Sequence, residues 1–201
     1  MKRGQRSNRA SIRAVALENG DTAIEEILIV TNENHRFLIL EQLEELKLQT
    51  KIRILLEPES KNTAPALTLA TLAAMDTNPD SVMVVTPADH YVKNLNSFTE
   101  AMGHAINRVA TATIFTLGID PIRADTAFGY IKYAGDEVVK DLITLKENPS
   151  LEEAESFVKT GKYAWNAGIF ILKPKNLDGR YPAIKTRNSH LDQQRLAKKI
   201  Q

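Results

Sequence analysis

The sequence predicts a three-layer α/β fold built on a mostly parallel sheet. Short β-branched runs alternate with amphipathic stretches through the first 119 residues, an order typical of a sheet covered by helices. The run 82–85 is apolar and Val-rich, as expected of a strand buried on both faces of a parallel sheet. Asp89 and His90 follow it, at the sheet edge where open α/β folds bind ligands.

The predicted elements follow one another regularly up to residue 119. We expect strands at 27–31, 52–56, 82–85 and 113–119, separated by helices at 37–46, 65–75 and 98–109. Asn32 or Asn34 can cap the first helix, and Asn62 or Thr63 can cap the second. Pro65 falls in the first turn of that second helix, where its missing N–H costs nothing.

The pattern changes after residue 119. Paired strands are predicted at 130–133 and 138–145, and a late strand at 163–172. A helix is expected at 151–159, with Ser150 as its cap and acidic residues in its first turn.

Composition predicts one cytoplasmic, soluble domain. Charged residues make up 25% of the 201 residues and nearly cancel, giving a formal net charge of +1. We therefore expect neither nucleic acid nor membrane as a partner. No run is long enough to span a bilayer, no signal peptide is evident, and there is no cysteine, as suits a reducing compartment.

The chain divides into three parts by pattern. We expect a basic, poorly patterned segment at 1–25, a domain at 26–175 and a polar tail at 176–201. The first segment has two interpretations, an arm for nucleic acid or a frayed terminus, and the lack of interleaved aromatic residues favours the second.

Three groups of residues are candidates for chemistry. Asp89 can cap the next element or hold Mg²⁺, which proteins usually bind through one carboxylate and substrate phosphates. The turn 62–66 can simply cap a helix, or its N–H groups can attract an anion. Around Gly129 the neighbouring aromatic rings suit either core packing or contact with a sugar.

Several motifs occur in a specific order. They are Thr31-Asn32-Glu33-Asn34-His35-Arg36-Phe37-Leu38, Glu57-Pro58, Asn62-Thr63-Ala64-Pro65-Ala66, Pro87-Ala88-Asp89-His90, Gly129-Tyr130-Ile131 and Trp165-Asn166-Ala167-Gly168-Ile169-Phe170. In this order and spacing they closely resemble the mannose-1-phosphate guanylyltransferases, bacterial sugar-nucleotide pyrophosphorylases. The resemblance covers about residues 26–175.

The resemblance implies a Rossmann-like, glycosyltransferase-A-like nucleotidyltransferase fold. It implies that GTP and mannose 1-phosphate react to give GDP-mannose and pyrophosphate, with Asp89 as catalytic residue and Mg²⁺ ligand. The implied nucleotide-binding residues are Glu57, Asn62, Thr63, Ala64 and Pro65. The implied sugar-phosphate residues are Gly129, Tyr130, Glu147, Asn166 and Gly168. In-line attack on the α-phosphorus requires positioning and charge neutralisation rather than a protein nucleophile.

The sequence also departs from the family pattern. The family's Gly-x-Gly-x-Arg loop, which cradles the triphosphate, does not occur in these 201 residues. The family's Glu-Lys-Pro is Glu147-Asn148-Pro149 here, which removes a cation that Lys146 could replace. Since one lost donor typically costs about 10²–10³ in rate, the alternative is a truncated, non-catalytic relative that binds sugar phosphate or sugar nucleotide.

The same departures carry a structural expectation. The chain is expected to be truncated at both ends relative to the family, without the strand that precedes the Gly-rich loop. The edge beside 27–30 would then be unpaired, and such an edge favours self-association, so a homo-oligomer is an expected state.

Overall fold

The computed structural model describes residues 24–57, 63–109, 114–135 and 137–177, and the structural statements below refer to them. The strands are β1 (Glu26–Asn32), β2 (Lys51–Glu57), β3 (Met83–Val85), β4 (Phe115–Ile119), β5 (Tyr130–Ala134), β6 (Asp141–Lys146) and β7 (Tyr163–Leu172). The helices are α2 (Arg36–Leu46), α3 (Thr63–Thr77), α4 (Leu95–Arg108) and α5 (Leu151–Thr160), with 3₁₀ turns η1 (Glu33–His35) and η2 (Pro174–Asn176). The predicted α/β class and element order are confirmed.

The strand pairing corrects the expectation of a mostly parallel sheet. β1 and β2 form a parallel two-stranded sheet, whereas the five-stranded sheet contains only antiparallel pairs among the described strands. The reason is the late strand β7, which pairs with β3 and β5 on one edge and with β4 on the other. β3 and β4 therefore run in the same direction but are separated by a strand of opposite direction, and β3 is half-buried rather than buried.

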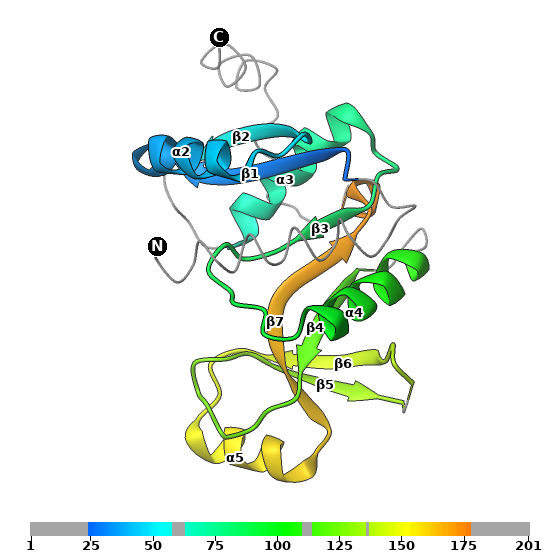
Figure 1. Ribbon diagram of the computed structural model, residues 1–201. Coiled ribbons are helices and arrows are strands. Elements are labelled where there is room, and N and C mark those ends of the chain that lie inside the picture. Colours follow the sequence, from blue (N-terminus) through cyan, green and yellow to red (C-terminus); the bar gives the residue numbers. More distant parts are fainter. Residues whose placement is uncertain (1–23, 58–62, 110–113, 136, 178–201) are drawn as a thin grey trace.

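β7 is the central strand of the molecule. In Figure 1 it runs as a long, bent ribbon from α5 at one end to η2 at the other. Its odd-numbered residues point into two apolar clusters. One cluster lies under α4 and contains Phe98, Met102, Ala105, Val109, Ala167, Ile169 and Ile171. The other lies under α5 and contains Tyr130, Ala154 and Trp165, with Phe157 and Tyr163 packed against them.

Local hydrogen bonds explain where the helices begin. Asn94 accepts the Ser97 N–H at 3.2 Å and caps α4, which starts three residues earlier than predicted. The predicted Ser150 cap is confirmed as a capping box, in which Ser150 and Glu153 each accept the other's backbone N–H. Asn32 also caps as predicted, but it caps the turn η1 that precedes α2.

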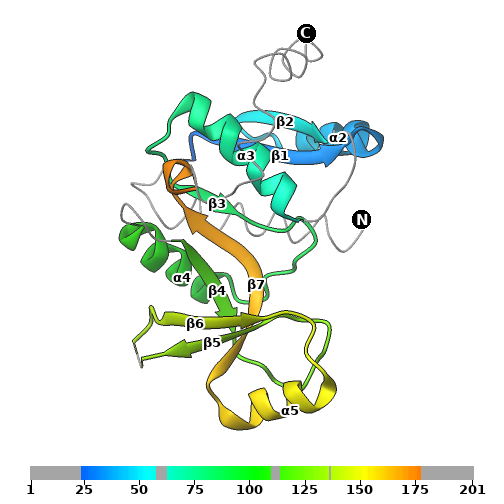
Figure 2. The ribbon, with the colours of Figure 1, turned by 180° about the vertical axis from the view of Figure 1, so that it is seen from behind.

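Helix α3 joins the two sheets. It contacts β1, β2 and β3 as well as η2, and Figure 2 shows it crossing between the two sheets. Arg53 on β2 donates hydrogen bonds to the Glu26 carboxylate at 2.8 Å and to the Ala73 carbonyl of α3 at 2.9 Å. None of the described helices has the length and apolar character that a bilayer span demands.

Candidate functional site

The middle of β7 is irregular, and its irregularity is built by Asn166. The Asn166 Oδ1 atom accepts the Gly168 N–H at 3.1 Å and the Thr116 hydroxyl at 3.0 Å. Gly168 has a φ of 65°, in the left-handed region that glycine adopts at no steric cost. The register of β4 against β7 shifts at the same level, between Thr116 and Gly118. One edge of β7 changes partner here, from β5 to β3.

Two loops meet β7 at this point. The Gly129 carbonyl, just before β5, accepts the Asn166 N–H at 2.8 Å. The loop that follows β3 also lies close to β7 here, since a β-carbon on Gly168 would lie 3.5 Å from Pro87 Cγ. The segment that bears Asp89 and the start of β5 therefore converge on Asn166 and Gly168. In open α/β sheets, ligands bind just beyond the carboxyl ends of the strands, and the Pro87 loop follows that end of β3.

Glu147 joins this group through Gly129. A β-carbon on Gly129 would lie 2.5 Å from Glu147 Oε1, so only glycine allows the carboxylate this close. Glu147 itself is exposed. The next residue, Asn148, has a φ of 48°, a conformation that asparagine tolerates better than most side chains.

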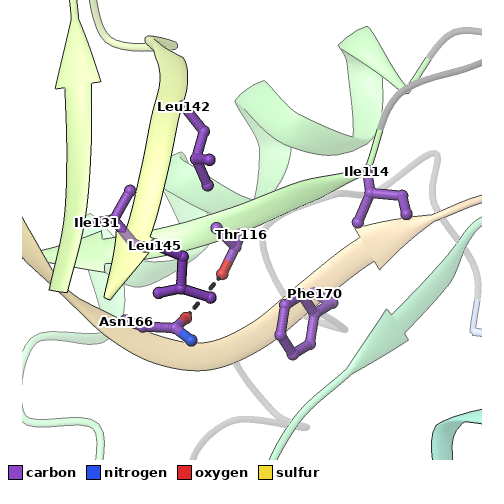
Figure 3. Close-up of a pocket in the computed structure, with 7 residues that line it drawn as sticks. All are labelled: Ile114, Thr116, Ile131, Leu142, Leu145, Asn166 and Phe170. Carbon is purple, nitrogen blue, oxygen red and sulfur yellow. Dashed lines mark hydrogen bonds between the residues drawn. The ribbon is translucent and has the colours of Figure 1, made fainter. Parts of the chain in front are cut away.

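A hollow lies on the same face of the five-stranded sheet (Figure 3). Its volume is about 180 Å³, and its lining residues are Ile114, Thr116, Ile131, Leu142, Leu145, Asn166 and Phe170. The wall is mostly apolar, with the Thr116–Asn166 hydrogen bond as its polar feature. Because a backbone N–H can only donate, the Gly168 contact fixes Oδ1 and leaves Nδ2 without a hydrogen-bond partner among the described residues.

Tyr130 lies on the opposite face of the sheet from this hollow. Its side chain is fully buried, its ring lies 5.3 Å from that of Phe157, and its hydroxyl accepts the Asp125 N–H at 3.0 Å. Its side chain therefore faces away from the hollow. The Tyr130 side chain supports the loop that precedes Gly129, and contact of Tyr130 with a sugar phosphate stays a prediction.

That loop is held by Asp125. Its carboxylate accepts the Ala127 N–H at 3.1 Å and an Arg123 N–H at 2.7 Å. The Ala127 N–H, followed by the Arg123 guanidinium, lowers the pKa of Asp125 below its ordinary value. Arg123 and Phe128 both lie against Trp165, at 5.6 Å and 4.9 Å between the centres concerned.

Asp89 lies exposed just beyond β3. No group of three or more His, Cys, Asp or Glu side chains gathers anywhere in the described part of the chain. The donor set thus fits an ion held by one carboxylate with substrate phosphates, and does not fit an ion caged by protein alone.

The predicted nucleotide-binding residues are only partly described. Asn62 and the side chains of Thr63 and Ala64 lie outside the described residues. Glu57 is the half-buried last residue of β2, and Pro65 is exposed in the first turn of α3. Their contact with a nucleotide stays a prediction.

Lys146 does not extend towards Gly129. Its Nζ lies 3.1 Å from Glu153 Oε1 on α5, so the cation proposed as a substitute is already paired. No role in the site was predicted from the sequence for Thr116, Asp125 or Glu153. Of these, only Glu153 left a readable signal, the Ser-x-x-Glu spacing of a capping box.

Comparison with known proteins confirms the resemblance. The nucleotidyl transferase family model matches residues 9–199. A putative mannose-1-phosphate guanylyltransferase of Vibrio cholerae is 38% identical over 153 residues, covering 75% of this chain and 32% of that protein. A mannose-1-phosphate guanylyltransferase of Escherichia coli is 37% identical over 165 residues, covering 78% of this chain and 34% of that protein. The chain spans about a third of the length of these relatives.

Solved structures confirm the nucleotidyltransferase-like fold. A structure described as mannose-6-phosphate isomerase from Helicobacter pylori has a TM-score of 0.70 and 33% identity, covering 77% of this chain and 58% of that one. A structure described as mannose-1-phosphate geranyltransferase from Thermus thermophilus has a TM-score of 0.67 and 28% identity, covering 75% of this chain and 43% of that one. A UDP-glucose pyrophosphorylase bound to UDP-glucose, 17% identical with a TM-score of 0.51, shares the fold.

Proposed function

Since the chain belongs to the nucleotidyl transferase family, we propose that it acts as a mannose-1-phosphate guanylyltransferase-like enzyme. The reaction would join GTP and mannose 1-phosphate into GDP-mannose and release pyrophosphate. Similarity to relatives that bear this name supports the choice of substrates. The single observation that carries the proposal is the convergence of Gly129, Glu147 and the Pro87 loop on the middle of β7.

The sugar phosphate would bind against Asn166 and Glu147. Asn166 Nδ2 is an unpaired donor among the described residues, and the Glu147 carboxylate is an exposed acceptor. A sugar offers hydroxyl groups that both donate and accept, so one hydroxyl can meet each of these groups. Gly129 leaves room for the approach because it has no side chain. Gly168 adopts the left-handed backbone conformation beside the Pro87 loop.

The chemistry requires alignment rather than a covalent protein intermediate. A phosphate oxygen of mannose 1-phosphate attacks the α-phosphorus of GTP, and the bond from that phosphorus to the oxygen bridging to the β-phosphorus breaks. Pyrophosphate leaves with the electron pair of that bond. Asp89 would hold Mg²⁺, which neutralises phosphate charge when bound. Glu147 and Asn166 would keep the sugar phosphate in line with the nucleotide.

Pyrophosphate release tests this proposal. The purified chain is mixed with GTP, Mg²⁺ and mannose 1-phosphate, and GDP-mannose is identified among the products. Asp89→Ala should abolish the release, whereas Asp76→Ala, at an exposed acid on α3, should leave it unchanged. Absence of product above the Asp89→Ala background would contradict the activity.

Calorimetry separates the enzyme from a non-catalytic binding protein. Mannose 1-phosphate and GDP-mannose are titrated into the chain and into Asn166→Ala. Heat with the wild type but without turnover would favour the binding protein. Absence of heat with both ligands would reject the sugar-phosphate site.

A further inference from the structure

We propose that Glu153 is a positioning residue that holds Glu147 against Gly129, an inference that rests on the proposed role of Glu147 in the sugar-phosphate site. Glu153 lies in the first turn of α5 and does not touch Gly129 itself. It acts on the short segment between β6 and α5, to which Glu147 belongs.

The Glu153 carboxylate holds both ends of that segment. Its Oε1 atom lies 3.1 Å from Lys146 Nζ, on the residue before Glu147. Its Oε2 atom accepts the Ser150 N–H at 2.8 Å, three residues after Glu147. The Ser150 hydroxyl accepts the Glu153 N–H at 3.2 Å in return, so the contact is reciprocal. One carboxylate therefore brackets the segment from two sides.

The residues inside the bracket leave little freedom for Glu147. Asn148 is fixed in the left-handed region, and Pro149 is buried with its φ restricted by the ring. On the other side, the Lys146 backbone pairs with Tyr130, the residue after Gly129. A carboxylate that is exposed yet lies against the Gly129 backbone requires such outside support, because burial does not hold it.

The pKa of Glu153 agrees with this geometry. The Ser150 N–H, followed by Lys146, lowers that pKa below its ordinary value. The carboxylate is therefore charged at neutral pH and retains both contacts.

The neighbouring acid supplies a matched control. Glu152 is exposed whereas Glu153 is half-buried, but both lie in the first turn of α5 and interact with the helix dipole in a similar way. It makes no contact with Lys146 or Ser150 among the hydrogen bonds and ion pairs of the described residues. A general loss of acid at the start of α5 should therefore appear in Glu152→Ala as well.

The first test reads the position of Glu147 without any ligand. The reference variant is Glu147→Gln. In ¹⁵N-labelled protein, it shows how far the Gly129 amide resonance moves when the adjacent charge is removed. We expect Glu153→Ala to move that resonance at least half as far, and Glu152→Ala to leave it near the wild-type position. An unmoved Gly129 resonance in Glu153→Ala, with a moved Ser150 resonance showing the cap lost, would overturn the proposal.

Two further variants separate positioning from helix stability. Glu153→Gln retains an acceptor for the Ser150 N–H and loses the charge for Lys146, and Lys146→Met removes the same ion pair from the other side. Both should move the Gly129 resonance less than Glu153→Ala does. The double variant Glu153→Gln/Lys146→Met should move it no further than either single variant. Additive effects would overturn the bracket.

The second test measures binding of mannose 1-phosphate by calorimetry. In Glu153→Ala the ligand must itself order Glu147, so the affinity for mannose 1-phosphate should fall about fivefold. The affinity should recover in part in Glu153→Gln and stay unchanged in Glu152→Ala. If the wild type binds no mannose 1-phosphate, the proposed function fails, while the Gly129 resonance still decides whether Glu153 positions Glu147. Equal affinity in wild type and Glu153→Ala would overturn the positioning role.

Discussion

The two sheets differ in how much of them is buried. In the unit 24–57, which contains β1, α2 and β2, no described residue is buried, and Phe37 on α2 is 72% exposed. Around the five-stranded sheet, both apolar clusters are closed, and Met102, Tyr130 and Ile171 have no exposed surface. Since buried apolar area is the main favourable term in folding, the five-stranded sheet should hold most of the stability.

The same difference in burial distinguishes the part of the chain that forms the site from the unit 24–57. The residues that converge on Asn166 all lie on or beside the five-stranded sheet, so their geometry rests on the closed clusters. The unit 24–57 depends on α3 and on Arg53 for its attachment. The free energy of local unfolding should therefore be lower for the unit 24–57 than for the residues of the site.

The largest expected effect comes from the closed core. Ile171→Ala removes a fully buried side chain under α4 and should lower the free energy of unfolding by about 2–5 kcal/mol. Leu38→Ala, at a residue 45% exposed on α2, should cost below about 1 kcal/mol. Urea unfolding followed by fluorescence of Trp165, the single tryptophan, measures both. Equal costs would remove the distinction between the two regions.

The link between the regions should give the next effect. Arg53→Met removes hydrogen bonds to Glu26 and to α3 and should destabilise the unit 24–57 by about 2 kcal/mol. Relative to the wild type, Arg53→Met should accelerate amide hydrogen exchange more in β1 and β2 than in β7. Lys51→Met is the control, because Lys51 also pairs with Glu26 but its side chain is 65% exposed. Equal acceleration in β7 would show a single cooperative unit.

Two glycines of the five-stranded sheet distinguish a residue that the fold requires from a residue that the site requires. A β-carbon on Gly118 would lie 2.8 Å from Ala164 Cβ on the neighbouring strand, so Gly118→Ala should cost about 1–3 kcal/mol in stability. Gly129→Ala would displace the flexible end of Glu147 instead. Its stability should change by less than about 1 kcal/mol, while affinity for mannose 1-phosphate falls roughly tenfold. Urea unfolding and calorimetry decide, and the reverse ranking would contradict the assignment.

The smallest effect concerns pH. The folded-state pKa of Asp125 is lowered, so its contribution to stability is fully present above its ordinary pKa of 3.8 and is lost as pH falls through the folded value. Asp125→Asn retains an acceptor for Ala127 but loses the charge. The urea midpoints of wild type and Asp125→Asn should differ at pH 6 and approach one another towards pH 3. A constant difference would show that the charge is not responsible.

Short-range features were predictable from the sequence, and long-range ones were not. The caps at Asn32 and Ser150 each join residues three positions apart, so the sequence contains the whole signal. The direction of β7 depends on strands far away along the chain, which no local pattern encodes. The sequence could predict that Gly129 and Asn166 belong together only through the resemblance, and their hydrogen bond agrees with it.

Two residues near the site show the same limit. Alternation along β5 indicates that Gly129 and Tyr130 face opposite sides, but which side holds the core depends on where α5 packs. From the sequence, Lys146 could point towards a sugar phosphate. In the structure, the capping box places Glu153 beside Lys146, and the two side chains pair.

The position of β7 as the shared strand has a consequence for biosynthesis. Met83, Phe115 and Tyr130 each await a partner that is translated after them, namely Leu172, Ile171 and Trp165. Until the ribosome has released that segment, the earlier strands have no common neighbour and their apolar edges stay open. Such delayed, sequence-distant pairing is slow and exposes nascent chains to aggregation. Chaperone supply and translation speed over 163–172 should therefore govern the yield of folded protein.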